Sequence, residues 1–76
     1  MTGKYIKTNQ GEIILFPNIV THSDLKHLHP VSAGFFSTYK DVYGDEHIKC
    51  YGESISLSLK SEIGDDEIAD RQFNSF

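Results

Sequence analysis

The sequence predicts an α+β domain: a small antiparallel sheet of four to five strands with two short helices packed on one face. Three observations support this prediction. Apolar residues alternate with serines over 53–60, and a two-residue period is typical of a strand. Residues 4–16 contain two extended runs around a glycine. The segments 21–28 and 64–73 place apolar residues at helical spacing. We therefore expect one domain, residues 1–76, with the order β-β-α-β-β(-β)-α.

The N-terminal segment predicts an antiparallel hairpin. Residues 4–8 and 12–16 are the two extended runs, and Gly11 lies between them at a turn. The second run is apolar almost throughout, which predicts a strand that is covered on both sides. It ends at Pro17, because proline cannot donate a hydrogen bond to a central ladder.

A short helix is predicted over 21–28, where Thr21 or Ser23 is a suitable N-cap. Pro30 disfavours helical geometry at the residue before it, so we expect the helix to end there. The following residues, 31–39, predict a strand whose first half contains small side chains.

The next strand is predicted over 47–51, after a polar loop. Its alternation places Ile48 and Cys50 on one face, but the apolar residues that follow have the opposite parity. The phase must slip at Gly52 and Glu53, so we expect a β-bulge or a tight turn there.

Length and charge restrict the function. A chain of 76 residues buries only about 60% of its unfolded surface, which favours a binding role over an enzyme cleft. Residues 1–40 carry four basic and two acidic groups, and residues 41–76 carry three basic and nine acidic groups. The acidic half argues against DNA or RNA binding, which relies on phosphate neutralisation. It suits docking on a basic protein surface, or simply solubility.

The cysteine content and the N-terminus favour a cytoplasmic protein. Cys50 is the one cysteine, so an internal disulfide is impossible. Residues 1–7 lack a signal-peptide pattern, and the longest apolar run, 13–16, is too short to span a membrane. We expect no membrane association.

The histidines and the cysteine are the candidates for chemistry. His22, His27 and His29 lie close together in the chain, and His47 and Cys50 are two more possible zinc ligands. Their spacing matches no metal motif, and the chain has no P-loop or dinucleotide fingerprint, so we expect no metal and no cofactor. Cys50 follows His47 by three residues, on the opposite face of a strand, so we expect a buried hydrophobe and no enzyme.

Two small-residue segments, 32–34 and 52–54, predict a hollow if their strands are neighbours. The hollow would present backbone groups, hydroxyl groups and one carboxylate to a small molecule, a nucleotide or another strand. Close packing of a helix on the sheet requires the same small residues and is the alternative. The residues expected to form the hollow are Ser32, Gly34, Tyr51, Glu53 and Ser54.

The acidic start of the C-terminal helix is the second candidate surface. Asp65 or Asp66 is a suitable N-cap, and acids in a first turn complement the helix dipole. A solvated helix face explains these residues. The alternative is an exposed patch, including Asp65 and Asp66, that docks on a basic partner.

The residues over 22–25, 32–35 and 50–54, with the acidic segment after them, resemble small uncharacterised proteins of bacteria and their phages. The resemblance covers most of the chain and implies no activity and no catalytic residues. It implies an accessory protein of a phage or mobile element that blocks a host defence component. We therefore expect a non-enzymatic protein that inhibits or sequesters a host protein, and a small-molecule or nucleotide binder is the alternative. Its bare strand face suggests a symmetric homodimer.

Overall fold

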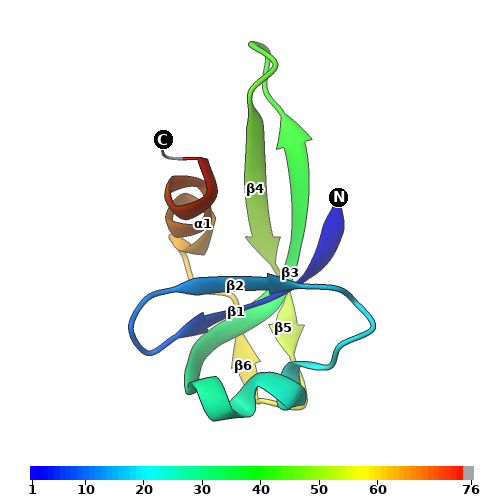
Figure 1. Cartoon of the computed structure of the whole chain (residues 1–76), viewed down its shortest axis with the longest axis vertical. Helices are drawn as coiled ribbons and strands as arrows, with labels where there is room; N and C mark the ends of the chain where they lie inside the picture. The colour runs from blue at the N-terminus through cyan, green and yellow to red at the C-terminus, as the bar shows by residue number, and fades with distance from the viewer. Residues whose placement is uncertain (75–76) are drawn as a thin grey trace.

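Four strands form an antiparallel sheet in the order β2-β1-β3-β4 (Figure 1). This computed structural model describes residues 1–74. The predicted N-terminal hairpin is confirmed, and its turn contains Gly11 at a φ of 84°. The strands are β1 (Thr2–Thr8), β2 (Ile13–Phe16), β3 (Pro30–Lys40) and β4 (Glu46–Tyr51).

Within residues 1–74, a second, two-stranded sheet and two helices complete the fold, which confirms the α+β class. The predicted helix over 21–28 is a 3-10 helix that begins after Thr21, whose backbone N–H donates to the Asp24 carboxylate at 3.3 Å. The predicted C-terminal helix is confirmed with a shift of one residue. The remaining elements are η1 (His22–Leu28), β5 (Glu53–Ser54), β6 (Leu59–Lys60) and α1 (Asp65–Asn74).

The two helices pack against consecutive residues of β1, Tyr5 and Ile6, so their arrangement differs from the predicted single covered face. Tyr5 belongs to a buried cluster with Ala69 of α1. Ile6 belongs to another cluster, onto which Leu25 and Leu28 of η1 pack. Successive side chains of a strand point to opposite faces, so α1 and η1 lie on opposite sides of the sheet. The β5–β6 hairpin shares the side of η1 through Leu57 and Leu59.

The prediction of one continuous strand over 53–60 is wrong. The segment is a hairpin in which residues 55–58 form the turn. The Ser54 hydroxyl accepts a hydrogen bond from the Leu57 backbone N–H at 3.3 Å. Ser58 has a φ of 56°, and its N–H donates to the Ile55 carbonyl at 3.1 Å. Ser54 and Ser58 therefore contribute to the turn and do not line one face of a strand. Ile55, which a strand would have buried, is 87% exposed.

The predicted interruption after β4 falls at Gly52, which has a φ of 78°. The chain leaves the four-stranded sheet there and enters the β5–β6 sheet. The change of sheet explains the phase slip, because the apolar residues before and after it belong to different core clusters. Ile48 and Cys50 pack with Tyr5, and Leu57 and Leu59 pack with Ile6.

Helix α1 supplies hydrogen bonds to both edge strands of the four-stranded sheet. At β4, Asp66 accepts from the backbone N–H of Cys50, and Asp70 accepts from that of Ile48, both at 2.6 Å. At β2, the Gln72 amide accepts from and donates to the backbone of Ile13, at 2.8 and 2.6 Å. These backbone groups are therefore engaged within the chain and not available for pairing with another strand.

Candidate functional site

The β3–β4 hairpin projects beyond the rest of the sheet (Figure 1). The pairing of β1 with β3 stops at Ser37, whereas the pairing of β3 with β4 continues to Lys40. The connecting turn, residues 41–45, is called the β3–β4 tip below. Its two apolar side chains, Val42 and Tyr43, are 93% and 86% exposed. The structure thus presents an apolar pair at the end of an extended arm.

Asp41 organises the tip. Its Oδ1 atom accepts hydrogen bonds from the backbone N–H groups of Tyr43 at 2.8 Å and Asp45 at 3.0 Å. The backbone of Asp41 also bonds to the backbone of Gly44 and of Asp45. An aspartate that accepts from the residues after it stabilises a turn. The tip therefore has a defined conformation that holds Val42 and Tyr43 outward.

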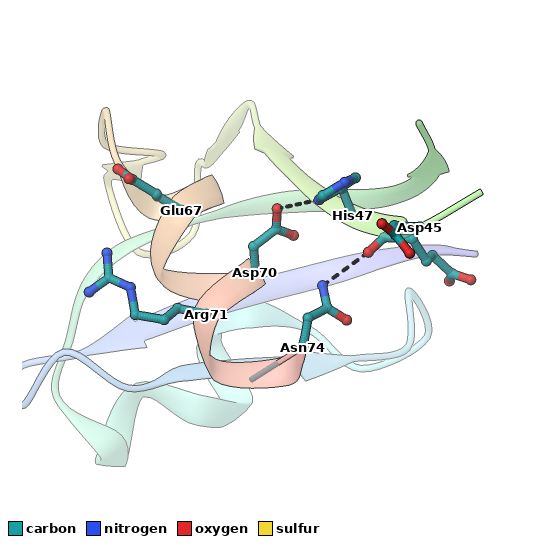
Figure 2. A pocket seen from close by; sticks show the side chains of 7 residues that line it. Asp45, His47, Glu67, Asp70, Arg71 and Asn74 are labelled. Atoms are coloured by element: carbon teal, nitrogen blue, oxygen red, sulfur yellow. Dashed lines mark hydrogen bonds and ion pairs between the residues drawn. The ribbon is translucent and has the colours of Figure 1, made fainter. Parts of the chain in front are cut away.

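His47 connects the tip to α1. Its Nε2 lies 2.7 Å from Oδ2 of Asp41, and its Nδ1 lies 2.9 Å from Oδ2 of Asp70. Figure 2 shows the contact with Asp70. The hydrogen bond to Asp41, followed by that to Asp70, raises the pKa of His47 above its ordinary value. The bond from His47 in turn lowers the pKa of Asp41.

A hollow of about 610 Å³ lies between β4 and α1 beside this cluster (Figure 2). The Asn74 amide closes one part of it by donating to the Glu46 carbonyl at 3.0 Å. Four of the lining side chains are carboxylates, so the hollow is acidic. The lining residues are Asp45, Glu46, His47, Glu67, Asp70, Arg71 and Asn74.

Asp65 is fully buried, so the prediction of an exposed docking patch that includes it is wrong. Its carboxylate accepts from the Tyr5 hydroxyl at 2.5 Å, from Lys7 Nζ at 2.8 Å and from the Ser32 hydroxyl at 2.8 Å. Burial raises the pKa of Asp65, but these bonds and one from the Glu62 backbone outweigh it, and the net pKa is lowered. Asp65 therefore fastens α1 to the sheet. Asp66 is exposed, and its carboxylate bonds to the β4 backbone.

The small residues expected to form a hollow pack closely instead. Ser32 is fully buried in the Asp65 network, and Ser54, the last residue of β5, is 2% exposed and bonds to the turn that follows it. A Cβ atom at Gly34 would collide with the carbonyl oxygen of Tyr51. The two strand segments do approach one another, but the backbone of β4 fills the space that the small side chains leave. Glu53 is exposed.

His22 and Cys50, which the sequence offered as candidates for chemistry, lie in surroundings that favour a structural role. His22 is buried between Phe16 and Phe35, and its Nε2 lies 2.7 Å from the Gly34 carbonyl oxygen. Burial, followed by the charge of Asp66, raises the pKa of the Cys50 thiol to about 12, which disfavours a nucleophilic thiolate at neutral pH. Over residues 1–74, the His, Cys, Asp and Glu side chains form no group of three or more that could hold a metal ion.

The tip and its connection to α1 were missed as a site in the sequence. Residues 40–46 read as a polar loop, although Asp41 is a typical first residue of a turn and Gly44 a typical later one. Val42 and Tyr43 stand inside this polar segment. An apolar pair between turn-forming residues was the available signal.

Comparison of the chain with protein-family models, curated proteins and solved structures found no match. Among the helices of residues 1–74, none combines the length and the apolar character that crossing a membrane requires.

Proposed function

We propose that this chain is a small, non-enzymatic protein that binds another protein through the β3–β4 tip. The supporting observation is the exposure of Val42 and Tyr43 at the end of a hairpin that Asp41 holds in shape. The fold buries little of these two side chains, so most of their apolar area remains available to a partner. Tyrosine is also a residue type that carries a large share of binding energy in protein interfaces.

The acidic side chains in and next to the tip favour a basic partner. Asp45 is the last residue of the tip, Glu46 follows it, and Glu67 of α1 lines the acidic hollow next to them. Opposite charge on the partner would steer the encounter and fix its orientation. The proposed partner surface is an apolar depression with a basic rim. Binding to such a surface would inhibit the partner if the depression is the partner's active site or binding site. The resemblance to phage proteins suggests that the partner is a host protein in the cytoplasm.

The test compares tip variants with a matched control on the purified, tagged protein. Partners retained from a lysate of the cells that naturally contain this protein are identified, produced in pure form and titrated against each variant. We expect Val42→Asp and Tyr43→Ala each to weaken binding about thirtyfold or more, because loss of an interface anchor costs about 2 kcal/mol or more and each 1.4 kcal/mol is about a factor of ten in affinity. Ile55→Asp, at an equally exposed apolar residue away from the tip, should bind like the unchanged protein. Unchanged affinity of both tip variants would overturn the proposal.

A small apolar ligand is the second candidate, and a separate hollow supports it. This hollow measures about 360 Å³, within the usual range of ligand pockets. Native mass spectrometry of the protein purified from cells would detect a retained ligand as extra mass. The same spectrum would count subunits and so test the predicted homodimer. The lining residues are Met1, Thr2, Leu15, Phe16, Pro17 and Phe36.

A further inference from the structure

We infer that His47 is a protonation-dependent clamp, which fixes the β3–β4 tip to helix α1 when its ring is charged and releases one of them when it is neutral. The regulatory meaning of this inference rests on the proposed binding role of the tip. The clamp itself follows from the contacts of three side chains, Asp41, His47 and Asp70, that belong to the tip, β4 and α1.

Both ring nitrogens of His47 must donate for the observed contacts to be favourable. Ionised carboxylates only accept hydrogen bonds, and a neutral imidazole carries one N–H. Asp41 faces Nε2 at 2.7 Å and Asp70 faces Nδ1 at 2.9 Å. Two donated bonds therefore require the imidazolium form. In the neutral form, one ring nitrogen would present its lone pair to a carboxylate oxygen.

Neither carboxylate can readily turn away to relieve that repulsion. The other oxygen of Asp41 holds the backbone N–H groups of Tyr43 and Asp45, which keep the turn in shape. The other oxygen of Asp70 holds the backbone N–H of Ile48 at 2.6 Å. The ring itself must give up one contact, and the connection between tip and helix is then broken at one end.

The surroundings of His47 favour its charged form. The ring of Tyr39 on β3 lies beside it, with centroids 5.4 Å apart. Most charged side chains around it are acidic, and the basic ones are Arg71, which lines the same hollow, and Lys49, which lies two residues along β4 and lines a hollow with Tyr39. Since the pKa of His47 is raised above 6.5, the clamp is complete at lower pH and is lost as the pH rises through the raised pKa. The other charged groups nearby are Asp45, Glu46, Lys49, Glu67 and Arg71.

The clamp can be tested on the isolated protein by NMR, with ¹⁵N labels in the imidazole and the backbone, across a pH series from about 5 to 10. We expect both ring nitrogens of His47 to be protonated at the acid end. The relaxation rates of the backbone amides of Val42 and Tyr43 should change with the same midpoint as the ring. Asp41→Asn removes one acceptor charge and should lower that midpoint.

Two variants separate the clamp from a general effect of pH. His47→Gln should abolish the pH-dependent change at the tip, whereas His27→Gln, at an exposed histidine of η1, should keep it. Tip amides that stay constant through the His47 midpoint would overturn the inference, as would an identical change in His47→Gln. Since no partner is present in this experiment, its failure leaves the binding proposal to its own test, and the converse also holds.

Discussion

The hydroxyl group of Tyr5 donates a 2.5 Å hydrogen bond to the carboxylate of Asp65, although the two residues stand 60 positions apart in the chain. Both are fully buried. Tyr5 lies on β1, and Asp65 is the first residue of α1. The same carboxylate bonds to Lys7 and Ser32, so one side chain joins the beginning of the helix to two neighbouring strands. Buried charges are tolerated when they are paired and hydrogen-bonded in this way.

Substitution of Asp65 by alanine should strongly destabilise the protein. The change leaves the largely buried Lys7 without its buried partner and leaves the Tyr5 and Ser32 hydroxyls without an acceptor. Loss of one member of a buried charge pair costs about 3–5 kcal/mol. Urea denaturation measures the free energy of unfolding, and Asp65→Asn, which keeps the shape of the side chain, should lose less. Glu67→Ala on the same helix is the exposed control, with a loss of at most about 1 kcal/mol. Equal losses for Asp65→Ala and Glu67→Ala would contradict the role assigned to Asp65.

The same network predicts a loss of stability in acid. The pKa of Asp65 is lower in the folded chain than its ordinary value of 3.8. The ionised carboxylate therefore contributes stability above that value, and the contribution is lost as the pH falls through the lowered pKa. Denaturation midpoints measured from neutral pH down to about pH 2 should fall more steeply for the unchanged protein than for Asp65→Asn. Parallel curves would show that Asp65 does not control the acid transition.

Removal of the β4 edge contacts should expose that strand. In Asp66→Ala, the Cys50 backbone N–H loses its acceptor, and its amide hydrogen exchange should accelerate about tenfold or less, as expected for a net hydrogen bond of about 0.5–1.5 kcal/mol. Exposed strand edges also pair between molecules, so size-exclusion chromatography with light scattering should show more self-association. Glu67→Ala serves again as the control. Unchanged exchange at Cys50 would show that the carboxylate does not protect the edge.

The turn between β5 and β6 offers a matched pair of glycine substitutions. Ser58 has a φ of 56°, where a residue with a Cβ atom is strained by about 1–2 kcal/mol and glycine is not. Ser58→Gly should be neutral or stabilise the fold by up to about 1 kcal/mol, after the entropy cost of glycine is included. Ser56, which does not have a positive φ, should lose about 0.5–1 kcal/mol on the same change. Thermal denaturation of both variants would distinguish them, and a larger loss for Ser58→Gly would contradict the strain argument.

Local patterns identified most elements but not their long-range contacts. The hairpin around Gly11, the strands β3 and β4 and the helix α1 all agree with the predictions, because their signals are carried by adjacent residues. The prediction of one strand over 53–60 was wrong because serines also favour turns. Here the Ser54 hydroxyl accepts a hydrogen bond from a backbone N–H group that a strand would otherwise use. The prediction that Asp65 is exposed was wrong for a different reason. An acid in a first helical turn is normally solvated, and only its distant contacts with Tyr5 and Lys7 make burial favourable.

The contacts of His47 show the same difference between local and long-range interactions. Asp41 and His47 are neighbours across a turn and are close in sequence, so their contact was accessible to sequence reasoning. Asp70 reaches His47 only because α1 docks along β4, and its spacing from His47 in the chain carries no sign of that arrangement. The prediction of a hollow was wrong because the backbone of a neighbouring strand occupies that space. Small residues at Gly34 and Ser32 indicated a close approach, but not that a carbonyl group and a carboxylate would fill the space.

The contacts of α1 with both edge strands have a consequence for the order in which the molecule matures. Asp66, Asp70 and Gln72 come after both edge strands in the chain, so β2 and β4 are covered only once α1 has itself been synthesised and has docked. Until α1 has docked, the backbone of both edges is open to pairing with a neighbouring chain. The state in which the sheet has formed but α1 has not docked is therefore the one with the greatest risk of aggregation, and a substitution in α1 can lower the yield of folded protein without altering the sheet itself.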